Sequence, residues 1–358
     1  MRGLSEPTMH ITDLLVEAVE RHASDLHVAA GLPPLLRVHG SLVRAGESES
    51  ESDLDGDGVM ALLRPLMNAQ QLHKLAHQLE VDFAHEQPGL ARFRVNAFHQ
   101  RRGPAAAIRV VPAQTPTLDS LQAPSVLREL LLLQRGLVLF TGPTGSGKST
   151  LMAALVDHRN RHEYGHILTL EDPIEFVHES HRSLVNQREV GTHTLGYAQA
   201  LRSALREDPD VILVGELRDL DTIRLALTAA ETGHLVLATL HASSAPQSVD
   251  RLVDVFPAGE KDMVRVMLSE SLQGVVAQTL CKTTDGQGRV AAVEIMRGTP
   301  AIRHLIREHK VAQMVSVMQS GMDQGMQTLD QHLSQLVRSG RISADEARRH
   351  ARFPETIR

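Results

Sequence analysis

The chain has 358 residues, with 37 Lys and Arg against 43 Asp and Glu, and its formal net charge is −6. Six of the acids lie in one stretch without a base, residues 46–58 (GESESESDLDGDG), so the remaining acids equal the bases in number. A neutral body argues against a protein that coats nucleic acid or anionic lipid through bulk charge. The chain also has only seven Phe, two Tyr and no Trp to stack on bases, and we expect no nucleic-acid partner.

Chain length and cysteine content further restrict the classes of protein to which the chain can belong. The length suggests about two domains. The one cysteine, Cys281, excludes a disulfide framework and any zinc site that needs two or more Cys of one chain. Acids interrupt the apolar residues near the N-terminus, and no run approaches the roughly 18 apolar residues of a membrane span. We therefore expect a soluble, cytoplasmic protein without an inserted membrane segment.

The N-terminal part predicts a mixed α+β domain. The acidic stretch, residues 46–58, is typical of a solvated loop, because clustered like charges with Gly and Ser bury too little surface to become ordered. Around it, spacing and turn residues predict, in chain order, an amphipathic helix over 9–22, strands over 25–28 and 35–38, helices near 58–67 and 69–79, and a strand over 105–111.

Residues 91–98 (ARFRVNAF) alternate as a strand does. A period of two places Arg92 and Arg94 on one face and Phe93 and Val95 on the other. A proline-rich stretch, residues 112–124, follows and predicts a linker. We place the boundary near residue 115, with domains 1–115 and 116–358.

The second domain predicts an α/β fold. Short apolar runs suited to a mostly parallel, buried sheet lie at residues 137–140, 167–170, 211–214 and 235–240. After about residue 260 the pattern becomes helical, with amphipathic stretches near 260–280, 300–308 and 328–338.

Residues 142–149 (GPTGSGKS) fit the phosphate-loop pattern G-x-x-x-x-G-K-[ST], between a predicted strand and a predicted helix over 149–160. Glycines let backbone N–H groups surround phosphates, and the helix N-terminus adds partial positive charge. Lys148 is expected at the β- and γ-phosphates of ATP, and the Ser149 hydroxyl at Mg²⁺. The candidate nucleotide contacts are Gly142, Pro143, Thr144, Gly145, Ser146, Gly147, Lys148, Ser149 and Thr150.

Carboxylates follow two of the apolar strands, which is the usual place for a ligand site in an α/β sheet. Glu216 ends VILVGE, and because Gly215 stands where a standard Walker B sequence has Asp, Glu216 is the candidate to act on the metal or its water. Glu171, Asp172 and Glu175 follow another strand. These three either serve the metal and the attacking water or form a solvated loop.

His234 and His241 flank the apolar run 235–240. A histidine at a strand end is more often a structural hydrogen-bonding residue than a catalytic one, and position alone favours that reading.

Several segments together resemble one family. They are ASDLH at 23–27, ARFRVNAF at 91–98, the phosphate loop, EDPIEFVH at 171–178, VILVGELRD at 211–219, ETGHLVLATLH at 231–241 and AIRHLIRE at 301–308. In this order they make nearly the whole chain similar to the PilT family of type IV pilus retraction ATPases, within the secretion-ATPase superfamily.

The resemblance implies a PAS-like N-terminal domain and a RecA-like ATPase domain assembled as a hexameric ring. It implies that Glu175 is the general base, that Glu216 is the Walker B glutamate, and that His234 and His241 form a catalytic pair. It also implies that arginines of the N-terminal domain contact the nucleotide. The matching candidates are Arg92, Arg94 and Arg109, among which the sequence does not choose. A solvated arginine face is the other reading.

The implied function is a Mg²⁺-dependent ATPase motor that retracts a pilus and drives twitching motility from the cytoplasmic face of the inner membrane, through a platform protein there. The single cysteine excludes the tetracysteine zinc motif usual in pilus-extension and type II secretion ATPases. AIRHLIRE resembles the AIRNLIRE of retraction ATPases, with His304 in place of Asn; an ordinary amphipathic helix is the other reading. The alternatives are another secretion-superfamily ATPase, for type II secretion or DNA transfer, and a non-hydrolysing accessory subunit. The sequence does not decide whether a second retraction ATPase works beside it.

Overall fold

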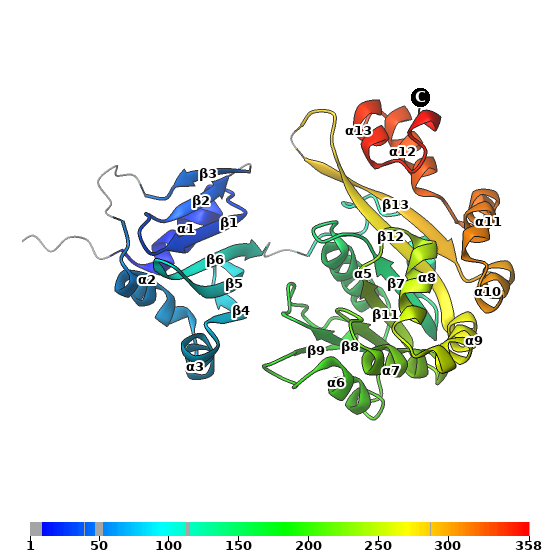
Figure 1. Cartoon of the computed structure of the whole chain (residues 1–358), viewed down its shortest axis with the longest axis horizontal. Coiled ribbons are helices and arrows are strands. Elements are labelled where there is room, and N and C mark those ends of the chain that lie inside the picture. Colours follow the sequence, from blue (N-terminus) through cyan, green and yellow to red (C-terminus); the bar gives the residue numbers. More distant parts are fainter. Residues whose placement is uncertain (1–8, 39, 47–52, 112–114, 287, 358) are drawn as a thin grey trace, which may run out of the picture. The chain divides into compact units, whose positions relative to one another are not determined.

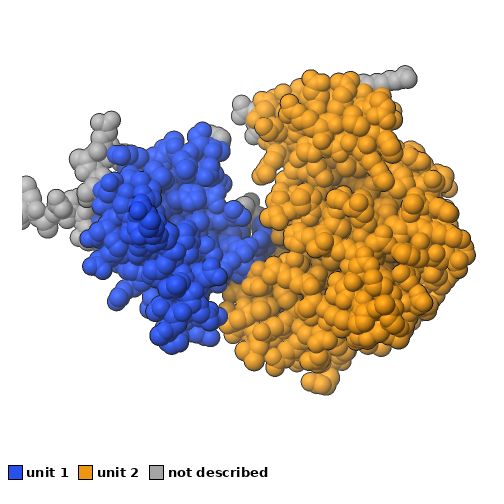
Figure 2. Space-filling view, in the orientation of Figure 1, with its two compact units in different colours: residues 1–114, 173–176 blue, residues 115–172, 177–358 orange. Residues whose placement is uncertain are grey.

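The computed structural model describes residues 9–38, 40–46, 53–111, 115–286 and 288–357 (Figure 1). By its internal contacts the chain divides into two compact units, Met1–Gln114 with Pro173–Phe176, and Thr115–Asp172 with Val177–Arg358 (Figure 2). Among the described residues, no helix combines the length and the apolar character that crossing a membrane requires.

The first unit is built on a six-stranded antiparallel sheet of order β3-β2-β1-β6-β5-β4. Its strands are β1 (Asp25–Ala29), β2 (Leu35–Val38), β3 (Ser41–Arg44), β4 (Glu80–Gln87), β5 (Ala91–Gln100) and β6 (Gly103–Val111). Its helices are α1 (Ile11–Glu20), α2 (Gly56–Leu63) and α3 (Ala69–Gln78), with a short 3-10 helix at Arg64–Leu66.

Alternation along β5 places its apolar residues in the core of this unit. Phe93 and Val95 are fully buried with Leu15 of α1 and Leu63 of α2, whereas Arg92 and Arg94 lie on the opposite face. The predicted division of this strand into an apolar and a basic face is confirmed.

The solvated loop predicted for residues 46–58 is wrong for its last part. Asp55 is the N-cap of α2, and its carboxylate accepts a hydrogen bond from the Gly58 N–H at 2.7 Å. An acid at this position satisfies a free N–H and faces the positive end of the helix dipole, so its charge is favourable there. Residues 47–52 of the stretch lie outside the described residues.

The second unit contains a seven-stranded sheet of order β13-β12-β7-β11-β10-β8-β9. All neighbouring strands are parallel except β12 and β13, which pair antiparallel. Its strands are β7 (Gly136–Thr141), β8 (Gly165–Glu171), β9 (Ser183–Glu189), β10 (Val211–Val214), β11 (Leu235–Leu240), β12 (Leu272–Lys282) and β13 (Arg289–Arg297). The predicted α/β fold with a mostly parallel sheet is confirmed.

Helices cover both faces of this sheet (Figure 1). Leu137 and Leu139 of β7 point into one apolar core, with α6 (Tyr197–Ala204), α7 (Leu220–Glu231), α8 (Ala245–Asp254), α9 (Lys261–Ser271), α10 (Pro300–Arg307) and α11 (Met314–Ser320). Val138 and Phe140 point into the other, with α4 (Val126–Leu131) and α5 (Lys148–His162). Because β7 is buried on both faces, it is a continuous apolar run.

The helix expected near residues 260–280 is wrong in its second half. Helix α9 ends at Ser271, and β12 begins at the next residue, between β7 and β13. A short apolar run does not distinguish a helix from a buried strand by periodicity. Pairing with β7, which lies far away in the sequence, decided the outcome. The strands β3, β4, β9 and β13 were also not predicted.

The C-terminal part packs against the far end of β12 and β13. Cys281 is fully buried in a small core with α12 (Leu329–Arg338) and α13 (Ala344–His350), and burial raises the pKa of its thiol to about 12. The predicted linker is also partly structured: residues 112–114 lie outside the described residues, but Leu118 is buried beside α4.

Candidate active site

The phosphate loop joins β7 to α5, as the sequence predicts. Gly142 and Gly147 have φ of 142° and 87°, a region that favours glycine. Lys148 is the first residue of α5, and its Nζ donates to the carbonyl oxygens of Gly142 at 2.7 Å and Pro143 at 3.0 Å. The loop therefore keeps the ammonium group over its own backbone, next to the helix N-terminus.

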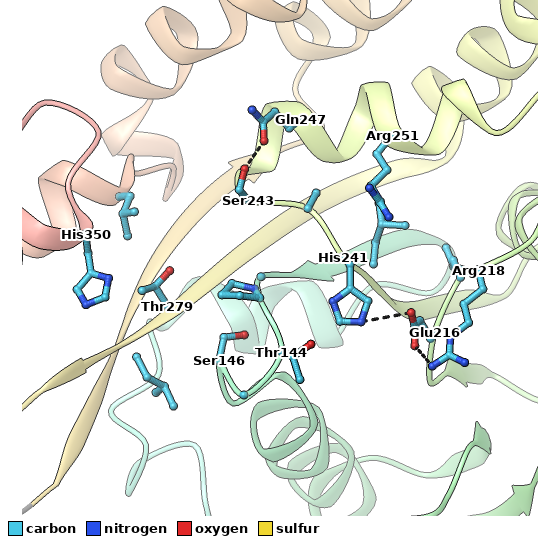
Figure 3. Close-up of a pocket in the computed structure, with 18 of the residues that line it drawn as sticks. Thr144, Ser146, Glu216, Arg218, His241, Ser243, Gln247, Arg251, Thr279 and His350 are labelled. Atoms are coloured by element: carbon cyan, nitrogen blue, oxygen red, sulfur yellow. Dashed lines mark hydrogen bonds and ion pairs between the residues drawn. The ribbon is translucent and has the colours of Figure 1, made fainter. Parts of the chain in front are cut away.

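Glu216 follows β10 at the carboxyl edge of the same sheet. Its carboxylate lies 3.3 Å from Nε2 of His241 and accepts a hydrogen bond from the Arg218 guanidinium at 2.7 Å (Figure 3). The hydrogen bond to Glu216 raises the pKa of Arg218, which stays charged. Only 18% of the Glu216 side chain is exposed, so two partners fix a largely buried carboxylate.

Gly215, which departs from the Walker B pattern, lies at a closely packed position. A Cβ at this position would lie 3.0 Å from the Leu170 carbonyl oxygen and 3.0 Å from the Tyr197 hydroxyl. An aspartate here would require these neighbours to shift by a few tenths of an ångström. Burial raises the pKa of Tyr197 and the negative charge of Asp172 raises it further, so Tyr197 stays a neutral phenol.

His241 reaches Glu216 because the residue after it is held in place. The Thr141 hydroxyl, at the end of β7, donates to the Ala242 carbonyl at 2.9 Å and accepts from the Ala242 N–H at 2.8 Å. Ser244 then caps α8 through its side chain. The ends of β7 and β11 are thereby tied together beside the phosphate loop.

His234 lies at the other end of β11. Since β11 runs parallel to β7, with Leu235 opposite Gly136 and Leu240 opposite Thr141, His234 stands at the amino edge of the sheet. At about 3.3 Å per residue, β11 separates His234 from His241 by roughly 20 Å. The ring Nδ1 of His234 lies 3.2 Å from the Ala229 carbonyl. The structure does not bring His234 to the phosphate loop.

The three other acids of the motif separate into two groups. Glu171 ends β8 and accepts hydrogen bonds from Thr169 at 2.6 Å and Gln187 at 3.1 Å, and Asp172 follows it. Glu175 belongs by its contacts to the first unit, where its carboxylate lies 3.8 Å from Nη1 of Arg94.

In the first unit, the three candidate arginines lie on one face of the sheet, because Arg94 stands directly opposite Arg109 and two residues from Arg92. Each approaches an acid on a neighbouring strand: Arg92 lies 4.0 Å from Glu86, Arg94 2.6 Å from Asp82, and Arg109 3.1 Å from Asp25. Sequence alternation predicted the Arg92 and Arg94 pair, and the strand pairing adds Arg109.

The AIRHLIRE segment forms α10, and Ile302, Leu305 and Ile306 are buried as its spacing predicts. Arg303 donates to the carbonyl oxygens of Gly298 at 2.7 Å and Ser269 at 2.9 Å. The first contact holds the end of β13, and the second caps the last turn of α9.

A cavity of about 1130 Å³ opens at the carboxyl edge (Figure 3). The phosphate loop, Glu216, Arg218 and His241 line it, and so do residues the sequence did not suggest: Gln247, Arg251, Asp254, Thr279, Arg289 and His350. Arg218 is two residues from Glu216 within a motif and could have been suspected. The others come from distant segments and carry no local signal.

The donor set of this edge suits Mg²⁺ held jointly with a nucleotide. Among the described residues, no group of three or more His, Cys, Asp or Glu side chains is arranged to hold a metal by itself. Mg²⁺ in nucleotide sites commonly takes one or two protein oxygens and completes its shell with phosphate and water. The Ser149 hydroxyl, in the first turn of α5, and the Glu216 carboxylate are such oxygens.

The chain is similar to known proteins over nearly its whole length. The sequence model of the type II/IV secretion system protein family matches residues 5–349. The type IV pilus retraction ATPase PilT of Pseudomonas aeruginosa is 58% identical over 349 residues, which are 98% of this chain and 100% of that protein. A twitching motility protein of Neisseria gonorrhoeae is 55% identical over 324 residues, 90% of this chain and 86% of that one.

Among solved structures, the crystal structure of the pilus retraction motor PilT with bound ADP has a TM-score of 0.89 and 43% identity to this chain, covering 97% of it and 98% of the solved chain. The predicted architecture, an N-terminal α+β domain followed by a RecA-like domain, is confirmed.

Proposed function

The chain belongs to the type II/IV secretion system protein family, and from that premise we propose that it is a Mg²⁺-dependent ATPase motor that retracts a type IV pilus and so drives twitching motility. The observation that carries the proposal is the meeting of three features at one cavity: the phosphate loop, the Glu216 carboxylate and the His241 imidazole.

In this proposal the loop binds the phosphates of ATP, and Lys148 leaves the carbonyls of Gly142 and Pro143 to contact the β- and γ-phosphate oxygens. Ser149 and Glu216 would hold Mg²⁺, the latter partly through water, and the bound metal would supply positive charge beside the phosphates. Arg218 and His241 hold the Glu216 carboxylate in its orientation through their contacts with it.

The role of Glu175 as the base that orients the attacking water, and the nucleotide contacts of Arg92, Arg94 and Arg109, rest on the family resemblance. The 3.8 Å approach of Arg94 to Glu175 supports the proposal that these residues act at one site. Within the described residues, His234 makes no contact that supports a catalytic role.

We further propose that the chain works as a homohexamer on the cytoplasmic side of the inner membrane, where it drives pilus disassembly through a platform protein. Relatives named as pilus retraction and twitching motility proteins support the role in pilus disassembly, whereas the ring and the platform protein rest on the family resemblance. A second retraction ATPase is a further partner in this proposal.

A deletion strain tests the proposal. We expect excess pili and no surface motility, with both restored by the wild-type gene but not by a Lys148→Ala variant, because retraction then lacks ATP turnover. Lys74→Ala, on α3 of the first unit, is the matched control and should restore both. A strain without pili would indicate extension instead, and unchanged piliation would indicate another secretion system.

A further inference from the structure

Strand β12 lies directly behind the phosphate loop. Its pairing with β7 ends at Ala277 opposite Thr141, the last residue of β7, and Gln278 is the next residue along. The Gln278 side chain is buried, with 6% exposed, although it is polar. A buried side-chain amide normally has a hydrogen-bond partner in the protein.

That partner is the loop backbone. Gln278 Nε2 donates to the Ser146 carbonyl oxygen at 2.7 Å. Two of the three glycines of the motif pack on the same residue: a Cβ at Gly147 would lie 2.7 Å from Gln278 Nε2, and a Cβ at Gly142 would lie 2.3 Å from the Gln278 carbonyl oxygen. The backbone of the phosphate loop therefore packs directly against Gln278.

The direction of this hydrogen bond has a consequence for phosphate binding. In a planar trans peptide the C=O and the following N–H point in opposite directions. Since Gln278 turns the Ser146 carbonyl toward β12, the Gly147 N–H points away from β12. That is the orientation an N–H needs in order to donate to a phosphate held in the loop.

The amide is used as a donor. Within the described part of the chain, Gln278 Oε1 is buried and has no hydrogen-bond partner, which costs stability. An apolar side chain of similar size would fill the space without that cost. What the glutamine adds is the N–H that holds Ser146.

We propose that Gln278 is a positioning residue for ATP binding: its side-chain amide holds the Ser146–Gly147 peptide in the phosphate-binding orientation. The proposal rests on the proposed ATPase function. It concerns the binding of phosphates, since Gln278 contacts the loop backbone, and it makes β12 part of the nucleotide site.

The test is steady-state ATP hydrolysis by the full-length protein with a Gln278→Met variant, which keeps the volume and removes the donor. We expect the KM for ATP and the Kd for ADP to rise about fivefold, the effect of one lost neutral hydrogen bond, with kcat within about twofold of wild type. The matched control is Gln273→Met, on the same strand at the opposite edge of the sheet, with unchanged KM.

A second variant, Gln278→Glu, keeps the shape but places a carboxylate oxygen against the Ser146 carbonyl, and we expect a larger rise in KM. If either folded variant keeps the wild-type KM, or loses kcat without a change in KM, the positioning role is wrong. If the wild-type protein itself does not hydrolyse ATP, the proposed function fails instead, so the two failures are distinguishable.

Discussion

The two edges of the seven-stranded sheet differ in chemistry although the same strands form both. At the carboxyl edge, the phosphate loop, Glu216 and His241 line a cavity, and Lys148 donates to a carbonyl of the loop. At the amino edge, His234 bonds to a nearby carbonyl, and Arg303 holds the end of α9 and the end of β13. Parallel strands turn all their carboxyl ends to one side, so ligand-binding groups collect there and the opposite edge is left for anchoring.

The largest expected effect is at the carboxyl edge. Glu216→Gln removes the charge that faces Arg218 and His241, and we expect ATP turnover to fall by about 100-fold or more. Glu231→Gln, at the end of α7 on the amino side of β11, is the matched control and should hydrolyse ATP as the wild type does. The test is steady-state ATP hydrolysis by the two purified variants. Near-normal turnover by Glu216→Gln would remove that residue from the site.

Substitutions of His241 and His234 compare the two edges of the sheet directly. His241→Asn loses the contact with Glu216, and we expect kcat to fall about tenfold or more, as for other residues that orient a functional carboxylate. His234→Asn should stay within about twofold of wild type, because β11 holds it roughly 20 Å from His241. Equal losses in both variants would show that His234 acts on a site the protomer alone does not form.

Arg303 tests whether the amino edge anchors the structure. Arg303→Ala removes charged donors from the Gly298 and Ser269 carbonyls, and we expect about 2 kcal/mol lower free energy of unfolding. Arg307→Ala, whose ion pair with Glu270 at 3.3 Å is exposed, should cost less than about 1 kcal/mol. Chemical denaturation measures both. Equal effects would contradict the anchoring role of Arg303.

The smallest expected effect is on the pH dependence of thermal stability, and it tests neither edge of the sheet. Burial lowers the pKa of His178 and His332. As the pH falls, both therefore stay neutral in the folded protein at pH values at which the unfolded chain already binds protons at these residues. Their contribution to stability is therefore present above the unfolded pKa of about 6.5 and is lost as the pH falls below it.

We expect the Tm to fall between pH 7.5 and pH 5.5, and His332→Gln to show a shallower fall. His309→Gln, which replaces an exposed imidazole, is the control and should follow the wild type. A steeper fall in His332→Gln would reverse the assigned sign.

The sequence by itself was sufficient wherever a function resides in contiguous residues. The phosphate loop, the strand before it and the helix after it follow from local spacing and glycine content, and the order of the motifs predicted the family and the α/β architecture. Asp55 shows the limit of composition: its surroundings read as a charged loop, yet one carboxylate caps α2. Local charge density does not record which N–H group a side chain will meet.

Only the tertiary structure decided which of the predicted residues meet. His234 and His241 belong to one motif, but a strand of six residues separates them and takes them to opposite edges. Gln278 lies 132 residues from Ser146 and carries no motif, yet strand pairing places its amide on the loop. β12 itself was mistaken for a helix because its partner β7 is distant in sequence. The physical reason is the same in each case: local spacing sets the face of a residue, whereas the pairing of distant strands sets its neighbours.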